Sequence, residues 1–205
     1  MVDNLRELGI KVVVVKGPKS IADVKENVKL IAKTLGEEDK GNLMIAKMDD
    51  KLAEIKEKVD NIKPEERKEL VLISLMTSYG GKGCTFDDIC QYAGVINGVS
   101  NAGLHNGQFL TKEMLVAINP DLLIMPVYND HNTFDIEKYN KEFLDDPALQ
   151  TLNAVKEKRF FYPREGYIYN SSQDIVFGVQ EVARAAYGEL FSQPENCHIS
   201  VAEIN

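Results

Sequence analysis

Hydrophobic residues follow two alternating patterns along this chain. Short apolar runs occur at residues 11–15, 70–76 and 122–125, and longer stretches between them place apolar residues at helical spacing. Unbroken apolar runs are typical of strands that are covered on both faces, and spacings of three and four residues are typical of amphipathic helices. The alternation predicts an α/β fold, with a mainly parallel sheet and helices on both faces.

Two consecutive helices are predicted in the first third of the chain. Ser20 is a suitable cap for a helix that ends at Gly36. Residues 37–62 then form a highly charged stretch whose apolar stripe is Met44, Met48, Leu52, Ile55, Val59 and Ile62. Some 26 residues of helix span roughly 39 Å. This helix is either a rigid rod between two lobes or one strand of a short coiled coil.

A second α/β unit is predicted from residue 68 onward. After the strand at 70–76 come a glycine-rich loop at 78–83, a helix that Thr85 caps, and a polar loop at 97–108. Further on, the pattern predicts a helix at 147–158, a strand at 159–162, a loop at 163–172 and a closing helix at 174–191.

Residues 109–126 carry the most specific pattern in the chain. Thr111 can cap a short helix, Pro120 within an Asn-Pro-Asp turn ends it, and an apolar strand follows. A helix that contains Glu, then Asn-Pro-Asp, then an apolar strand resembles a signature of the iron-siderophore, haem and cobalamin substrate-binding proteins of ABC importers. The order of the other predicted elements resembles the same family.

The resemblance implies two α/β lobes that are joined by one long helix, with the ligand held between them. It divides this chain into a first-lobe remnant (1–36), a connecting helix (37–63), a second lobe (64–193) and a tail (194–205). Most of a first lobe and a secretory or lipoprotein signal are expected before residue 5, so the chain is interpreted as a fragment of an extracytoplasmic protein. Unpaired edges at residues 11–15 predict that the fragment self-associates.

Composition limits the function classes further. The net charge of −8 argues against a nucleic-acid partner. No apolar run reaches the roughly 18 residues of a transmembrane helix. Cys84 and Cys90 are six residues apart and Cys197 is far away, which is poor zinc spacing. No metal site and no resident cofactor are therefore expected, and small, partly buried thiols are the preferred interpretation.

Loops at the carboxyl ends of the strands are the expected ligand contacts. Lys82 is suited to an anion, His131 to a haem iron or a chelate, and Arg164 to the oxygens of an anionic chelate. Tyrosine offers a flat face with a polar tip. The candidate ligand-binding residues are Tyr79, Lys82, Tyr128, His131, Arg164, Tyr167 and Tyr169.

The resemblance also implies a partner. Glu113 stands where the family carries a glutamate that docks on arginines of the permease, and the permease and its ATPase are the implied partners. The expected function is capture of an iron chelate, haem or a corrinoid for an ABC importer, without enzymatic activity. The alternative is a subunit of a metallocluster oxidoreductase or a tetrapyrrole chelatase with a similar lobe. The sequence leaves the choice of ligand open.

Overall fold

The protein forms a four-stranded parallel sheet between two layers of helices. The computed structural model describes residues 2–75, 78–127, 134–164 and 166–202. Within them the sheet runs in the order β2-β1-β3-β4, and every neighbouring pair is parallel. The strands are β1 (Glu69–Leu72), β2 (Ile96–Asn97), β3 (Leu122–Ile124) and β4 (Phe160–Phe161). The predicted α/β class and parallel sheet are confirmed, although β1 is shorter than the predicted strand.

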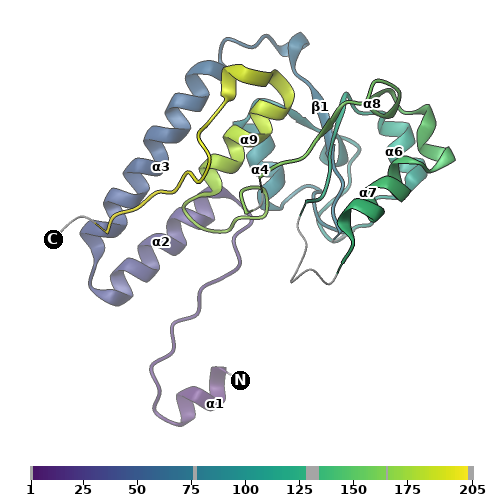
Figure 1. Ribbon diagram of the computed structural model, residues 1–205. Helices are drawn as coiled ribbons and strands as arrows, with labels where there is room; N and C mark the ends of the chain where they lie inside the picture. The colour runs from purple at the N-terminus through teal and green to yellow at the C-terminus, as the bar shows by residue number, and fades with distance from the viewer. Residues whose placement is uncertain (1, 76–77, 128–133, 165, 203–205) are drawn as a thin grey trace.

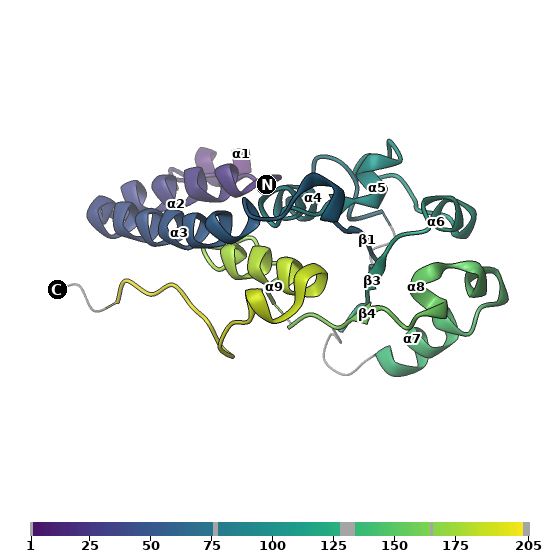
Figure 2. The ribbon, with the colours of Figure 1, turned by 90° about the horizontal axis from the view of Figure 1, so that it is seen from above.

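Alternate residues of β1 face two separate cores, as the two-residue period of a strand requires. Leu70 and Leu72 belong to one buried cluster, and Val71 belongs to the other. The first face is covered by α3 (Glu38–Val59), α4 (Thr85–Tyr92) and α9 (Ile175–Tyr187). The second is covered by α5 (Gly98–Asn101), α6 (Lys112–Ile118), η3 (Pro147–Thr151) and α8 (Asn153–Lys156), with α7 (Ile136–Leu144) beside them. Figure 2 shows the sheet edge-on between these layers.

The first predicted helices form a hairpin. In α2 (Ile21–Leu35), Ser20 accepts a hydrogen bond from the Asp23 amide, and Gly36 adopts the left-handed conformation at the other end. A Cβ on Gly41 would lie 2.4 Å from the Ala32 Cβ, so glycine lets α3 cross α2 closely. The apolar stripe of α3 is buried in the same core as α9. The stripe thus packs within the chain instead of facing a coiled-coil partner, and the rod between two lobes stays a prediction.

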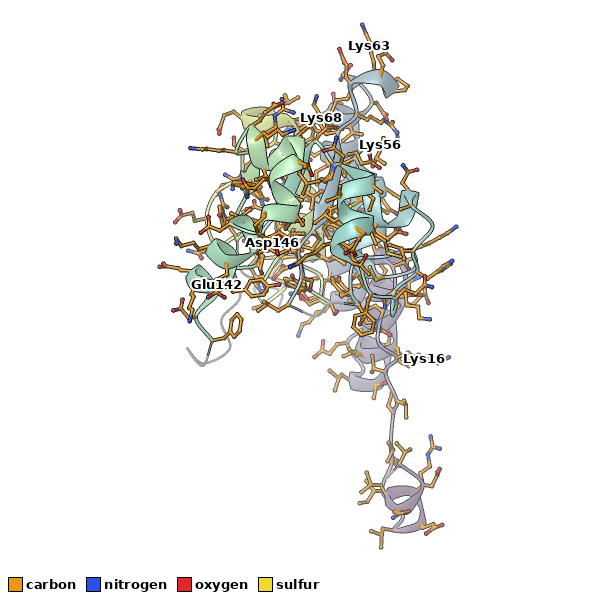
Figure 3. All side chains as sticks on the ribbon, turned by 90° about the vertical axis from the view of Figure 1, so that its right-hand side faces the viewer. Lys16, Lys56, Lys63, Lys68, Glu142 and Asp146 are labelled. Atoms are coloured by element: carbon orange, nitrogen blue, oxygen red, sulfur yellow. The ribbon has the colours of Figure 1, made fainter. Side chains whose placement is uncertain are left out.

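The predicted strand at residues 11–15 was wrong. Residues 10–18 have no regular structure, and Val13, Val14 and Val15 are 49%, 50% and 43% exposed. A strand needs a neighbour to satisfy its backbone groups, and no strand among the described residues pairs with this stretch. Together with α1 (Val2–Glu7) it forms an extension that leaves the body (Figure 1). In Figure 3, Lys16 lies where the extension leaves and Lys63 and Lys68 lie at the opposite, amino end of the sheet.

Several predicted boundaries also need correction. The predicted helix at 147–158 is broken at Leu152, whose extended backbone separates η3 from α8. The supposed polar loop at 97–108 contains α5, and β2 ends at its first residue, while α7 was not predicted at all. Cys84, rather than Thr85, is the N-cap residue of α4. The closing helix ends at Tyr187 and continues as η4 (Gly188–Phe191); a further short helix is η1 (Pro64–Glu66).

The C-terminal tail packs onto the domain. Ile199 is buried in the core with α3 and α9, and the Ser200 carbonyl accepts a hydrogen bond from Lys47 of α3 at 2.7 Å. The tail therefore joins the long helix to the last helix. None of the helices that the structure describes combines the length and the apolar character needed to cross a bilayer.

Candidate ligand-binding site

The helix–turn–strand of residues 109–126 has the predicted local structure. The Thr111 hydroxyl accepts a hydrogen bond from the Met114 amide at 3.3 Å, so it caps α6. Asn119 ends the helix in the left-handed conformation, and its side-chain oxygen accepts from the Asn153 amide at 2.9 Å. All three residues of β3 are buried. This unit fixes the carboxyl end of β3 and holds the first turn of α6 beside it.

Two of the predicted tyrosines meet at the carboxyl end of β1. The ring centroids of Tyr79 and Tyr169 lie 5.5 Å apart with an interplanar angle of 39°. The Tyr79 hydroxyl is hydrogen-bonded to the Thr85 hydroxyl at 2.8 Å, and the Tyr169 hydroxyl donates to Ser74 Oγ at 3.4 Å. Ser74 is the second residue after β1, so the pair stands at the edge where ligands meet a parallel sheet.

Helix α7 adds further aromatic rings to this edge. Tyr139 lies 5.6 Å from Phe134 and 6.4 Å from Phe143, measured between ring centroids. With Tyr79 and Ser74, residues Tyr139 and Phe143 line a cavity of about 80 Å³ at the start of α6. We call Tyr79, Tyr139 and Tyr169 with Ser74 the tyrosine wall.

Burial sets the protonation of the wall. It raises the pKa of Tyr79 and of Tyr169 above the usual value, although hydrogen bonds to Thr85 and Ser74 oppose the rise. Burial also raises the pKa of Tyr139. The three phenols are therefore neutral at physiological pH, and they offer flat faces and hydroxyl groups rather than phenolate ligands.

A buried polar network holds the glycine-rich loop beside the wall. The Asn97 amide donates to the Gly80 carbonyl at 2.8 Å and to Asp87 Oδ1 at 3.0 Å. The Ser100 hydroxyl donates to the same carboxylate oxygen, and the Gly83 amide donates to Asp87 Oδ2 at 3.3 Å. The loop is thus anchored from α4, β2 and α5, which fixes the position of Tyr79.

Lys82 projects from this loop into solvent. Its backbone is fixed because its amide donates to the Leu104 carbonyl at 2.9 Å and its carbonyl accepts from the Asn106 amide at 3.0 Å. The exposed ammonium group lies outside the described lining of the small cavity.

Arg164 and Tyr167 are turned away from the tyrosine wall. The Arg164 guanidinium donates to the backbone carbonyls of Gln193, at 2.9 Å, and Pro194. The Tyr167 hydroxyl donates to the Cys197 carbonyl at 2.9 Å, and its ring packs on Phe177 of α9. Both side chains hold the C-terminal tail against the domain.

Two candidate residues remain to be placed, and two residues of the tyrosine wall were not among the candidates. Tyr128 and His131 lie outside the described residues. Tyr139 was missed from the sequence because the segment that becomes α7 was not recognised as a helix. Ser74 was missed because the predicted strand at 70–76 placed it within the strand, whereas β1 ends at Leu72. The spacing of Phe134, Tyr139 and Phe143, five and four residues apart, was the signal that could have found an aromatic helix face.

Glu113 lies exposed in the first turn of α6. A hydrogen bond from its own backbone amide lowers the pKa of its carboxyl, and the Thr111 hydroxyl lowers it further. The side chain is therefore a carboxylate on an open helix surface, next to the strand that ends at the candidate site.

The long helix and the parallel sheet define the class of this molecule as an α/β domain whose carboxyl edge carries the candidate ligand site. The sequence profile of the family described as "Periplasmic binding protein" matches residues 2–165, and the chain belongs to this family. This is a family of binding proteins and not of enzymes, which disfavours the oxidoreductase and chelatase alternative.

A curated relative and two solved structures are similar to this chain. It is 25% identical over 198 residues to the uncharacterized ABC transporter substrate-binding lipoprotein YvrC of Bacillus subtilis, with 94% of this chain and 59% of YvrC covered. The chain thus spans about three fifths of that relative's length.

The periplasmic heme-binding protein RhuT of Roseiflexus sp. RS-1, in apo form, superposes with a TM-score of 0.75 at 18% identity, over 91% of this chain and 70% of RhuT. The molybdate periplasmic binding protein MolA of Haemophilus influenzae superposes with a TM-score of 0.74 at 15% identity, over 93% of this chain and 63% of MolA. At these identities the two structures establish the shared fold.

Proposed function

We propose that this chain is the larger part of the substrate-binding component of an ABC importer, and that its tyrosine wall forms one side of the ligand cleft. The whole protein holds its ligand between this wall and a first lobe, and delivers it to a permease with an associated ATPase. YvrC, which is called a substrate-binding lipoprotein, supports this function and an extracytoplasmic location.

The tyrosine wall is the observation that carries the proposal. Three neutral phenol rings stand together at the carboxyl edge of a parallel sheet, where open α/β folds bind their ligands. Flat aromatic faces with polar tips suit a ligand that has an extended flat surface and polar groups at its rim.

The charges near the wall favour a flat chelate over a small oxyanion. Lys112 is the one charged residue among the described residues that line the small cavity. Its ammonium group is paired with the Asp146 carboxylate. Because the names of RhuT and MolA show that this fold serves both haem and molybdate, side chains must decide between such ligands. We infer that haem, a corrinoid or a ferric siderophore is the ligand class, and that Tyr128 and His131 add to its contacts.

Titration calorimetry with a panel of ligands tests the proposal. The panel is gallium protoporphyrin IX, cyanocobalamin, ferrichrome and molybdate, added to the chain and to its Tyr169→Ala and Tyr92→Ala variants. Tyr92 is an exposed tyrosine at the end of α4 and serves as the control. We expect one of the chelates to bind with a dissociation constant above about 1 μM, because one wall encloses a ligand poorly.

Tyr169→Ala should weaken that binding and Tyr92→Ala should not. Preferential binding of molybdate, or equal affinity in both variants, would overturn the ligand assignment. A dissociation constant well below 1 μM would show that the chain needs no second lobe.

A further inference from the structure

A pocket of about 540 Å³ opens between α7 and the carboxyl ends of β3 and β4. Apolar and polar side chains line it together, among them Pro126, Ile136, Glu137, Asn140, Leu144 and Tyr162. We propose that this pocket is a subsite of the ligand cleft for an amide group at the rim of the chelate, and that Asn140 selects amide-bearing chelates over carboxylate-bearing ones. This inference rests on the proposed function and narrows its ligand class.

The pocket lies at the same edge of the sheet as the tyrosine wall. Pro126 is the second residue after β3 and Tyr162 is the first after β4, so both stand where parallel sheets meet their ligands. Helix α7 contributes to both places. Tyr139 belongs to the wall, whereas Glu137 and Asn140, three residues apart on one helix face, line the pocket. A flat ligand on the wall thus extends its rim across α7 into the pocket.

Asn140 holds a hydrogen-bond acceptor that the described part of the chain leaves unused. The residue is only 8% exposed, and its Nδ2 donates to the Pro126 carbonyl at 2.9 Å. Because a carbonyl only accepts, this bond fixes the orientation of the amide and leaves Oδ1 as its free end. Oδ1 is buried and has no hydrogen-bond partner among the described residues. A buried acceptor without a donor is costly, so an occupant that donates an N–H group is favoured.

The charges around the pocket favour the same kind of occupant. Lys141 lies in the lining, but its ammonium group is paired with the Asp145 carboxylate at 3.3 Å. None of the ion pairs between described residues includes Glu137, which is exposed at the pocket. A ligand carboxylate would therefore meet a like charge and a second acceptor, whereas an amide N–H group would meet two acceptors.

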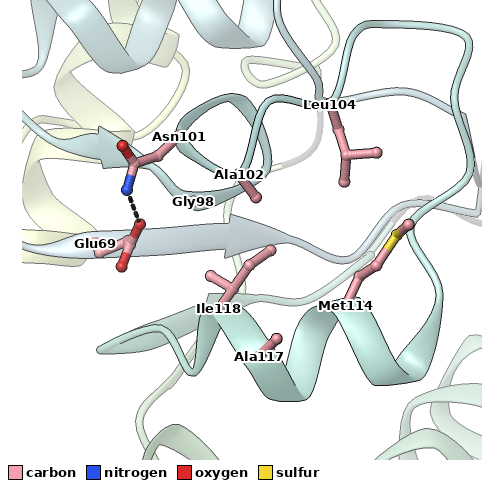
Figure 4. Close-up of a pocket in the computed structure, with 8 residues that line it drawn as sticks. All are labelled: Glu69, Gly98, Asn101, Ala102, Leu104, Met114, Ala117 and Ile118. Carbon is pink, nitrogen blue, oxygen red and sulfur yellow. Dashed lines mark hydrogen bonds between the residues drawn. The ribbon is translucent and has the colours of Figure 1, made fainter.

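The cavity between α5 and α6 lacks this feature. Its lining is mainly apolar, with Leu104, Met114 and Ile118, and the Glu69 carboxylate at one end accepts a hydrogen bond from the Asn101 amide at 2.9 Å (Figure 4). Within the described residues, none of the buried polar atoms that lack a partner belongs to its lining. The unused acceptor therefore singles out the pocket beside α7.

A matched pair of ligands tests the inference. Gallium protoporphyrin IX and its bis-propionamide share one macrocycle and differ only in whether the rim carries carboxylates or primary amides. Equilibrium dialysis gives the dissociation constant of each for the unmodified chain and for its variants. Two further probes separate the natural sources of amide groups: dicyanocobinamide carries primary amides around a corrin ring, and ferrichrome carries peptide amides.

Three variants accompany the ligands. Asn140→Leu removes the acceptor at similar volume, and Glu137→Lys reverses a charge at the pocket on an exposed residue that folding does not depend on. The control is Glu142→Lys, which makes the same charge change at an exposed position of α7 outside the described lining (Figure 3). Melting temperatures of all variants are measured alongside.

We expect the unmodified chain to prefer the bis-propionamide by about fivefold, the effect of one hydrogen bond of ordinary strength. Asn140→Leu should remove this preference, Glu137→Lys should shift it toward the dicarboxylate, and Glu142→Lys should keep it. Binding of dicyanocobinamide or ferrichrome should weaken in the first two variants as well. If Asn140→Leu does not fold, Glu137→Lys decides the question against Glu142→Lys.

Equal or tighter binding of the dicarboxylate by the unmodified chain would overturn the inference, as would a preference that both pocket variants retain. If the dicarboxylate is preferred and Tyr169→Ala weakens it, the proposed function stands and only the amide subsite fails. If none of the four probes binds, the proposed function fails and the subsite fails with it.

Discussion

The two halves of the loop at residues 163–172 have different roles in this protein. Tyr169 faces Tyr79 and Ser74 at the carboxyl edge of the sheet, whereas Arg164 and Tyr167 bind backbone carbonyls of the C-terminal tail. In the sequence the three side chains resemble a single cationic and aromatic ligand site. The comparison teaches that neighbouring residues in a loop can point to opposite sides of it, and that only the fold separates binding from anchoring.

The anchoring half depends on one buried carboxylate. Glu181 of α9 is fully buried, and its Oε1 accepts hydrogen bonds from the Arg164 amide at 3.0 Å and from the Arg184 guanidinium at 3.1 Å. Its Oε2 accepts from the Gln193 amide group at 3.1 Å. This carboxylate therefore joins the loop, α9 and the tail. The tyrosine wall, by contrast, contains no carboxylate among its four residues.

Removal of this carboxylate should give the largest effect. Glu181→Ala leaves the Arg184 guanidinium and two amide donors without their acceptor, so we expect a loss of about 3–5 kcal/mol in the free energy of unfolding. Urea denaturation measures it. Glu189→Ala, which removes an exposed glutamate just beyond α9, is the matched control and should stay within about 0.5 kcal/mol. Similar losses in both variants would contradict the anchoring role.

The tyrosine wall should make the protein sensitive to alkaline conditions. Because burial raises the pKa of Tyr79 above 10.0, the folded protein keeps a proton that the unfolded chain loses. The stabilisation is present in full below pH 10 and is lost as the pH rises from there toward the folded-state pKa, by up to about 1.4 kcal/mol per pH unit.

Melting temperatures between pH 9 and pH 11 test this expectation. The fall should be smaller in Tyr79→Phe, whereas Tyr92→Phe, at an exposed tyrosine, should behave like the unmodified chain. Identical alkaline profiles for all three proteins would show that Tyr79 is not protected from ionisation.

Ligand affinity should separate the two halves of the loop. Tyr169→Ala removes a ring from the wall, and we expect affinity for the bound chelate to fall about tenfold, or roughly 1.4 kcal/mol. Arg164→Ala should change stability without a comparable loss of affinity, because its guanidinium is occupied by the tail. Calorimetric titration of both variants decides between them, and a larger affinity loss in Arg164→Ala would restore the single-site interpretation.

The smallest expected effect belongs to the Tyr167 hydroxyl. Tyr167→Phe removes one hydrogen bond to the Cys197 carbonyl and keeps the ring on Phe177, so we expect a loss of about 1 kcal/mol in unfolding free energy. Thermal denaturation measures the loss, and ligand affinity should not change. A clear affinity loss in this variant would place Tyr167 in the binding site.

The sequence predicted those parts of the fold that depend on local chemistry. Ser20, Gly36 and Thr111 mark helix ends through their own side chains or backbone preference, and the apolar strand after Pro120 needs no distant information. The strand at 11–15 was wrong because a β-branched run forms a strand only beside a partner strand. α7 was missed because it is mostly polar, with few buried residues.

The candidate site was predictable only in part. Residue type and position after a strand identified Tyr79 and Tyr169, whose rings do meet. The same reasoning included Arg164 and Tyr167 because a sequence does not record which way a loop side chain points. Their partners, Glu181 and the tail carbonyls, are between 17 and 30 residues away along the chain and become neighbours only after folding.

The most direct test of the tyrosine wall is an NMR titration with ring-labelled tyrosine. The chain has eight tyrosines, and their ring signals can be followed as gallium protoporphyrin IX, cyanocobalamin or a gallium siderophore is added. Single Tyr→Phe variants assign the signals, and the method detects weak binding. We predict that one of these ligands shifts the signals of Tyr79, Tyr139 and Tyr169 most strongly and leaves Tyr167 unchanged. Shifts centred on Tyr167, or no shift with any of the three ligands, would contradict a ligand cleft at the tyrosine wall.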